Sequence, residues 1–118
     1  MKIALDIDRV LADFDVRLVY CLNKLYGLEL VPSDIIMDDF DALFCLNKQE
    51  KNILFNEVFS SIDHSPTVEG AVEGCELLVE NGVELFLLTA RIKKEITYEW
   101  LNAYFPKFDF SVYFKESI

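Results

Sequence analysis

Two aspartates, Asp6 and Asp8, follow a short apolar run at residues 3–5. Side chains alternate along an extended strand, so residues two positions apart point to the same side. Two carboxylates held side by side repel each other, and a divalent cation is their usual neutralising partner. One carboxylate of such a pair can attack an electrophile while the other moves a proton. The pattern indicates phosphoryl chemistry, and the alternative is that the two aspartates are only a helix cap and a turn residue.

A second candidate element lies at residues 83–91. Its apolar residues 83–88 predict a strand, which runs directly into Thr89, Ala90 and Arg91. A hydroxyl and backbone N–H groups at a strand end, just before a helix, suit a phosphate oxygen. The two elements together are much more specific for phosphate chemistry than either is alone.

These two segments resemble the first two motifs of the haloacid-dehalogenase (HAD) superfamily. Residues 6–14 (DIDRVLADF) resemble its first motif, and residues 87–91 (LLTAR) resemble its second. Within the superfamily the chain is similar to the 5'(3')-deoxyribonucleotidase-type phosphatases, whose first motif commonly continues into the same VLADF sequence. The likeness covers nearly the whole chain and is strong at the two motifs.

The resemblance implies a magnesium-dependent phosphomonoesterase that acts on a small phosphorylated substrate such as a (deoxy)nucleoside monophosphate. Asp6 would be the nucleophile that forms an aspartyl-phosphate, and Asp8 would protonate the leaving alcohol and then activate water. Thr89 would hold a phosphate oxygen, with Ala90 and Arg91 also in the substrate site. Mg²⁺ would be bound by the Asp6 carboxylate and the main-chain carbonyl of Asp8.

The chain departs from the family pattern after the second aspartate, where the family usually has glycine and this chain has Arg9. Only glycine adopts positive φ at little cost, so the turn either uses an ordinary conformation or is strained. The Arg9 side chain either faces solvent or reaches a phosphate as a fixed cation.

A second departure concerns the third and fourth motifs. Lys115 is the candidate for the third-motif lysine, because it follows residues 111–114, which we expect to form a short buried strand; a solvated lysine is the alternative. The sequence shows no fourth strand with the acids that complete the magnesium site in the family. Three explanations stay open: a fragment of a longer protein, truncation by its own gene, or a homodimer that completes the sheet.

Without a fourth strand, the strand that carries the nucleophile would lie at an edge of the sheet. Ile3, Ala4, Leu5 and Ile7 would then form an exposed apolar edge. Such edges invite pairing with another chain.

Composition agrees with one globular domain spanning residues 1–118, since 53% of the residues are hydrophobic. A net charge of −10 argues against a nucleic-acid polymer or an anionic membrane as a partner, though a metal and a few cations can still bind a small phosphate. Cys21, Cys45 and Cys75 have no metal-site spacing, and a reducing cytoplasm fits them. Cys75 is expected in the core, and His64 in a loop.

The segment between the two motifs predicts a helical insertion, residues 14–66, that caps the site as in the family. Leu18, Cys21, Leu22 and Leu25 recur at helical spacing, and a second helix is predicted over residues 48–59. Caps exclude water and set specificity. The aromatic residues of this segment supply either core packing or a base-stacking platform; they include Phe14, Tyr20, Phe40, Phe44 and Phe55.

The order strand, helix, strand, helix, strand predicts an α/β fold: a Rossmann-like parallel sheet with flanking helices, HAD-like, with the helical cap after the first strand. Two alternatives stay beside the phosphatase. A signalling receiver domain has this size and acidity, but Asp38, Asp39 and Asp41 lack a preceding apolar strand. A catalytically weak or silent HAD-like domain, retained for phosphate-ligand binding or assembly, is the other.

Overall fold

Three parallel strands form the sheet of this computed structural model, which describes residues 1–35, 47–60, 65–91 and 93–115. The elements in chain order are β1 (Lys2–Leu5), α1 (Phe14–Tyr26), the 3₁₀ helix η1 (Pro32–Asp34), α3 (Lys48–Ser60), α4 (Ala71–Glu80), β2 (Glu84–Thr89), α5 (Lys94–Tyr104) and β3 (Ser111–Phe114). The strand order is β1-β2-β3 with both pairs parallel. The predicted α/β fold class is confirmed.

Several sequence predictions fall on residues outside the described part of the chain. They concern Cys45, His64, Phe40 and Phe44, and the acidic residues at positions 38–41.

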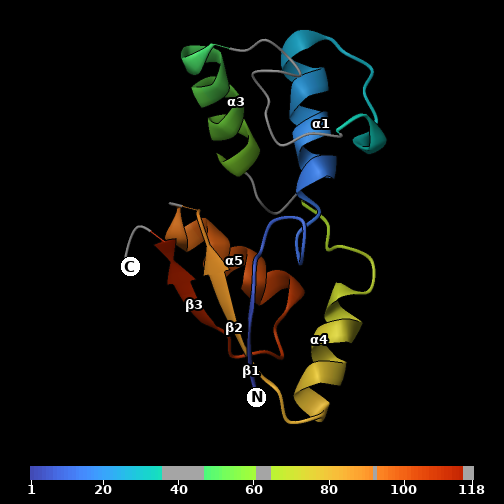
Figure 1. Cartoon of the computed structure of the whole chain (residues 1–118). Helices are drawn as coiled ribbons and strands as arrows, with labels where there is room; N and C mark the ends of the chain where they lie inside the picture. Colours follow the sequence, from blue (N-terminus) through green and yellow to red (C-terminus); the bar gives the residue numbers. More distant parts are fainter. Residues whose placement is uncertain (36–46, 61–64, 92, 116–118) are drawn as a thin grey trace.

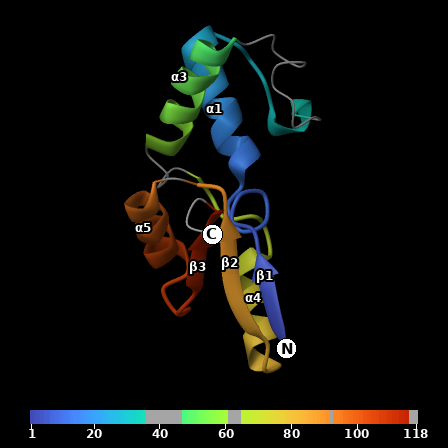
Figure 2. The ribbon, with the colours of Figure 1, turned by 60° about the vertical axis from the view of Figure 1, so that its left-hand side comes forward.

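One face of the sheet is buried beneath α4 and α5. Parallel strands joined in the order β1-β2-β3 by right-handed crossovers place both connecting helices on the same face. Leu85 and Leu87 of β2 accordingly share one core with Cys75 of α4 and with Trp100 and Leu101 of α5. Figure 2 shows β1 at the outer edge of the sheet with α4 behind it. This core fixes the strand ends that carry the predicted site.

The opposite face of the sheet is only partly covered. Phe86 of β2 is half-buried and its ring meets that of Tyr113, edge to face, at 5.7 Å between centroids. Tyr113 is 51% exposed, so the expectation that residues 111–114 form a buried strand is wrong in part. The physical reason is that β3 is an edge strand with helices on one side only, which buries Phe114 but leaves Ser111 and Tyr113 exposed.

The expected edge position of β1 is confirmed, with one correction. Ala4 is exposed, and Ile3 and Leu5 are half-buried. Ile7, however, is fully buried, because the chain turns after β1 and directs this side chain into the core of the sheet and helices. The apolar edge is therefore confined to the strand itself.

Pairing of the β1 edge with a second copy stays a prediction. An unpaired edge offers a row of free N–H and C=O groups to another strand. We expect the purified chain to show a mass of twice 13.7 kDa by light scattering at high concentration, with dissociation on dilution. A mass of 13.7 kDa at every concentration would contradict the homodimer.

Helices α1 and α3 form a separate layer beyond the ends of the strands (Figure 1). Their buried residues make a second apolar cluster, which consists of Phe14, Leu18, Cys21, Leu22, Leu54 and Val58. Asp13 caps α1 by accepting a hydrogen bond from the Val16 amide at 3.4 Å, and Gly27 ends the helix with φ 64°, a conformation that favours glycine. α1, η1 and α3 all lie within residues 14–66, the range predicted for the cap.

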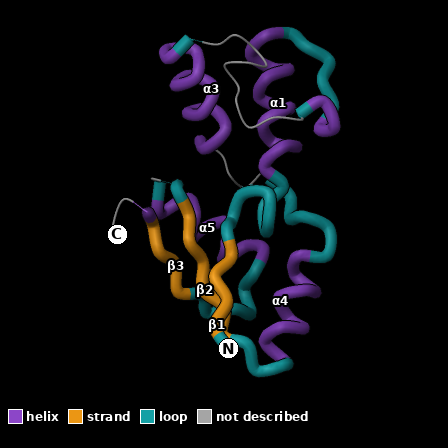
Figure 3. Tube along the Cα trace, in the orientation of Figure 1, coloured by secondary structure: helices purple, strands orange, loops and turns teal. Residues whose placement is uncertain are grey.

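Residues 11–13, before α1, and residues 66–68, before α4, run side by side below this layer (Figure 3). The Asp13 amide donates to the Pro66 carbonyl at 2.8 Å, and the Val68 amide donates to the Leu11 carbonyl at 2.8 Å. Ala12 and Thr67 form an antiparallel bridge between them. The helical layer is thus anchored at one two-stranded junction directly beside Asp8.

Polar contacts also hold α3 against α1. Arg17 is buried, and its guanidinium donates to the backbone carbonyls of Glu57 at 3.2 Å and Val58 at 3.4 Å. Lys24 pairs with the Glu57 carboxylate at 2.7 Å; this hydrogen bond raises the pKa of Lys24 and lowers the pKa of Glu57. Arg17 and Lys24 thus fix the position of α3 relative to α1.

The two described cysteines are core residues. Burial raises the pKa of the Cys21 and Cys75 thiols, which keeps them protonated and unreactive. The prediction that Cys75 belongs to the core is confirmed, with 3% of its surface exposed.

Candidate active site

The predicted site residues gather at one edge of the sheet. Asp6 follows β1 directly, Thr89 is the last residue of β2, and Lys115 follows β3. Because the strands are parallel, their carboxyl ends meet at the same edge, where ligands bind in open α/β sheets. This edge faces the α1–α3 layer (Figure 1).

In the loop after β1, several backbone amides donate hydrogen bonds to one carbonyl group. The Ile7 carbonyl accepts hydrogen bonds from the Leu11 amide at 2.9 Å and the Ala12 amide at 2.8 Å. Arg9 adopts φ 71° in this loop, a left-handed conformation that costs a non-glycine residue on the order of 1 kcal/mol. Of the two possibilities for this turn, the strained one is therefore correct.

The Arg9 side chain points toward α1. Its Nε donates to the Asp15 carboxylate at 2.9 Å, and its guanidinium lies 5.5 Å from the centre of the Phe14 ring. It does not line the cavity described below. These contacts give no support to the alternative in which Arg9 reaches a phosphate.

The two motif aspartates have different surroundings. Asp6 is exposed, and its Oδ1 accepts a hydrogen bond from the Ile7 amide at 2.8 Å. Asp8 is half-buried, and both of its carboxylate oxygens accept hydrogen bonds from Arg91: Oδ2 from Nε at 3.0 Å and Oδ1 from Nη2 at 2.5 Å. A two-point contact of this kind fixes the orientation of a carboxylate. Asp6 is therefore accessible to a ligand, while Asp8 is held in place.

Arg91 links the ends of β1 and β2 to the helical layer. Its backbone amide donates to the Thr89 hydroxyl oxygen at 3.1 Å, and its guanidinium lies 5.5 Å from the centre of the Phe59 ring on α3. The side chain is 4% exposed. Thr89 itself is buried.

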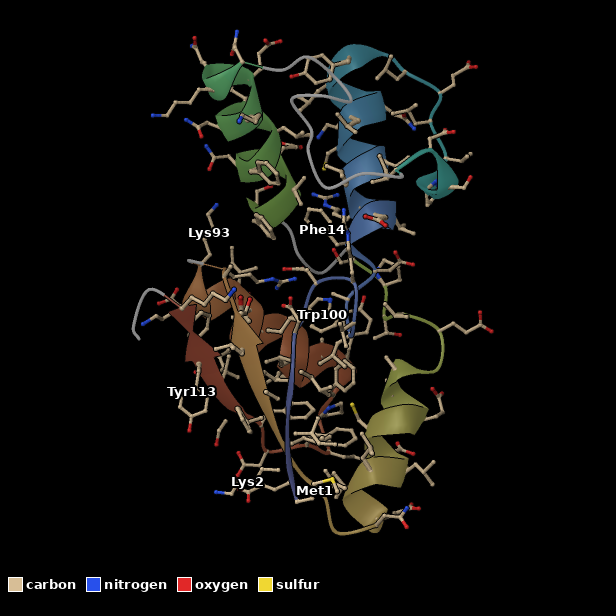
Figure 4. The ribbon with its side chains drawn as sticks, viewed as in Figure 1. Met1, Lys2, Phe14, Lys93, Trp100 and Tyr113 are labelled. Carbon is tan, nitrogen blue, oxygen red and sulfur yellow. The ribbon has the colours of Figure 1, made fainter. Side chains whose placement is uncertain are left out.

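A cavity of about 460 Å³ lies between α3 and the strand ends. Its wall is formed by Asp8 and Ala90–Arg91 at the strand ends, by Lys93, Ile96 and Thr97 at the start of α5, and by Asn52, Phe55, Asn56 and Phe59 of α3. Figure 4 shows Lys93 projecting from the start of α5 toward the helical layer. The Phe55 and Phe59 rings stack with an interplanar angle of 14°. A small organic ligand fits a cavity of this size and mixed polarity.

Three of the sequence-predicted site residues line the cavity, namely Asp8, Ala90 and Arg91; Asp6, Thr89 and Lys115 do not. Lys115 is exposed, and no hydrogen bond or ion pair joins it to Asp6 within the described residues. Of the aromatic candidates, Phe55 lines the cavity and Phe14 packs in the helical layer. Tyr20 is exposed and stacks on Arg17.

Sequence reasoning missed most of the cavity wall. Asn52 and Asn56, like Phe55 and Phe59, are separated by four residues, which places each pair on one face of a helix. That spacing was a usable signal once α3 had been predicted as a cap helix. Lys93, Ile96 and Thr97 carried no such signal, because their position depends on how α5 begins.

The donor set for a magnesium ion is small. No cluster of three His, Cys, Asp or Glu side chains suited to a metal is found among the described residues. Asp6 offers an exposed carboxylate, and the turn bonds use the Ile7 and Ala12 carbonyls and not that of Asp8. Magnesium is commonly bound by one or two protein oxygens, with water and substrate phosphate completing its shell. The Asp6 carboxylate and the Asp8 carbonyl are oxygens that these turn bonds leave available for such an ion.

Comparison with known proteins finds similar folds but no family model or curated protein that matches the sequence. Among solved structures, YfnB of Bacillus subtilis, a magnesium-bound protein described as a HAD-hydrolase, aligns with a TM-score of 0.62 over 98% of this chain at 14% identity. The fold is HAD-like.

A hydrolase from Pseudomonas syringae aligns with a TM-score of 0.53, over 98% of this chain at 15% identity. This chain spans 65% of the length of YfnB and 59% of the length of the Pseudomonas protein. At these identities the likeness concerns the fold.

None of the described helices is both long and apolar enough to span a membrane.

Proposed function

We propose that this chain is a magnesium-dependent, nucleotidase-like phosphomonoesterase that acts on a small phosphorylated substrate through an aspartyl-phosphate on Asp6. The observation that carries this proposal is the placement of Asp6 and Asp8 directly after β1, at the sheet edge where β2 ends in Thr89. Asp6 is open to a ligand, and Asp8 lies in the wall of the cavity. The HAD-like fold agrees with this chemistry.

In the first step, a carboxylate oxygen of Asp6 attacks the phosphorus atom of the ester. The bond between phosphorus and the leaving oxygen breaks, and the departing alcohol takes a proton from Asp8. The alcohol then lies beside Asp8, which lines the cavity. The body of the leaving group therefore occupies the space beneath α3.

In the second step, Asp8 takes a proton from a water molecule, which attacks the phosphorus atom of the aspartyl-phosphate. The bond between phosphorus and Asp6 breaks, and inorganic phosphate and free Asp6 are produced. Arg91 holds both oxygens of Asp8 and so keeps this carboxylate aimed at the reacting centre.

Asp6 and the Asp8 carbonyl would hold Mg²⁺, with Lys115 as a further cation if it turns toward the phosphate. A bound magnesium ion supplies a positive charge that neutralises the phosphate oxygens. The Thr89 hydroxyl would donate a hydrogen bond to a phosphate oxygen, because its own oxygen already accepts a hydrogen bond from the Arg91 amide.

Support for a nucleoside as the leaving group comes from α3. The stacked rings of Phe55 and Phe59 offer an apolar surface, and Asn52 and Asn56 offer hydrogen-bond donors and acceptors beside it. A planar base with a polar edge matches both features.

A binding domain without catalysis is the second candidate. It is favoured by the small number of metal-binding oxygens among the described residues and by the occupation of both Asp8 oxygens by Arg91.

Phosphate release from deoxynucleoside monophosphates and p-nitrophenyl phosphate tests the proposal. We expect release in magnesium chloride, little release in excess EDTA, and recovery when magnesium is restored. No release from any ester by the folded chain would contradict the phosphatase and favour the binding domain.

A further inference from the structure

Arg91 has a hydrogen-bonding group that its known contacts leave unused. Nε and Nη2 are taken by Asp8, whereas Nη1 is buried and has no hydrogen-bond partner among the described residues. A buried donor without an acceptor destabilises the folded state, and the cost is larger when the donor belongs to a charged group. Folded proteins pair nearly all of their buried polar groups, so the unpaired Nη1 calls for an explanation.

The surroundings of Arg91 suggest where the missing acceptor comes from. Arg91 lines the cavity together with Asp8, while the ring of Phe59 lies beside the guanidinium. A guanidinium carries only donors and stays protonated at any physiological pH. The group that completes Arg91 is therefore an acceptor. Nη1 has almost no accessible surface, so a ligand oxygen in the cavity can supply that acceptor once the side chains covering Nη1 move aside.

The position beside Asp8 identifies which part of a substrate supplies that acceptor. Asp8 is proposed to act on the leaving oxygen, whereas the phosphate lies toward Asp6 and Thr89, which do not line the cavity. An acceptor at Nη1 thus belongs to the leaving group, close to the ester oxygen. Lys93, Asn52 and Asn56 provide further polar groups around the same space.

We propose that Arg91 determines specificity: it holds Asp8 with two nitrogens and binds an oxygen of the leaving group with the third. The chain then prefers phosphate esters of polyhydroxylated or carbonyl-bearing alcohols, such as sugars and nucleosides, over esters of plain hydrocarbons. This inference rests on the proposed function, because it assigns the cavity to the leaving group.

Equilibrium binding to a variant that cannot turn over separates the two proposals. We would titrate the full Asp6→Asn chain with ribose 5-phosphate and with phenyl phosphate in magnesium chloride, using calorimetry. When Arg91→Lys is introduced into the Asp6→Asn chain, the dissociation constant of ribose 5-phosphate should rise about 10- to 100-fold, which corresponds to the loss of one charge-assisted hydrogen bond. The dissociation constant of phenyl phosphate should change less than about threefold. Lysine keeps the charge, but its single ammonium cannot hold Asp8 and reach the ligand together.

Arg91→Gln, in which the new side chain is uncharged, is measured in parallel. If one of the two variants fails to fold, the other still tests the proposal. The matched control is Arg17→Lys, which alters another buried arginine; its guanidinium donates to backbone carbonyls of α3, and it does not line the cavity. We expect this control to leave the ratio of the two dissociation constants unchanged.

If the Arg91 variants weaken the binding of both ligands equally, or weaken the binding of neither, the proposal that Arg91 determines specificity is overturned. Failure of the folded Asp6→Asn chain to bind either ester would overturn it as well. Selective weakening of ribose 5-phosphate, combined with no phosphate release by wild type, would uphold the Arg91 site and reject the phosphatase.

Discussion

Asp6→Asn should abolish phosphate release while the protein stays folded. The amide has no nucleophilic oxygen anion, so the aspartyl-phosphate cannot form, and we expect turnover to fall by more than about 10⁴-fold. Asp6 is exposed, and its oxygen that accepts the Ile7 amide has an equivalent in asparagine. The free energy of unfolding should therefore change by less than about 0.5 kcal/mol. Phosphate release and urea denaturation, measured on the same preparation, check both expectations.

The matched control for Asp6→Asn is Asp15→Asn. Asp15 is an aspartate in the first turn of α1 that pairs with Arg9 at 2.9 Å and does not line the cavity. Turnover should survive this change nearly intact. Full activity in Asp6→Asn would show that the nucleophile lies elsewhere.

Local sequence patterns and the family resemblance were sufficient to predict where strands such as β2 and helices such as α3 lie in the sequence. Residues 83–88 predicted a strand, and β2 spans Glu84–Thr89. Helical spacing predicted a helix over residues 48–59, and α3 spans Lys48–Ser60. These predictions succeeded because apolar periodicity depends on which face of each element is buried.

Long-range contacts could not be predicted in the same way. Asp8 and Arg91 are 83 positions apart in the sequence, and the pairing of β1 with β2 is what brings them together. Sequence reasoning placed Arg91 in the substrate site without showing that Asp8 takes two of its nitrogens. The burial of Ile7 was missed for a related reason, since it depends on a turn that a left-handed Arg9 allows.

The same pair makes Asp8 important for stability as well as for catalysis. Asp8→Ala removes both acceptors of a guanidinium that is 4% exposed and leaves a buried charge without its partner. Because the Asp8 side chain is itself 24% exposed, the cost should lie below that of a fully buried pair, at about 2–3 kcal/mol. Turnover should fall about 10²- to 10⁴-fold through loss of the proton-transferring group. Urea denaturation and phosphate release measure the two losses separately.

Two further variants separate the role of Asp8 in stability from its role in catalysis. Asp8→Asn keeps one acceptor for Arg91, so it should lose as much activity as Asp8→Ala but only about half as much stability. The double variant Asp8→Ala with Arg91→Met removes the unpaired charge and should recover most of the stability without restoring turnover. If Asp8→Ala is as stable as wild type, the buried pair does not contribute to the fold, and Arg91 must find another acceptor in solution. If the double variant is no more stable than Asp8→Ala, the loss comes from packing around Asp8 and not from the unpaired guanidinium.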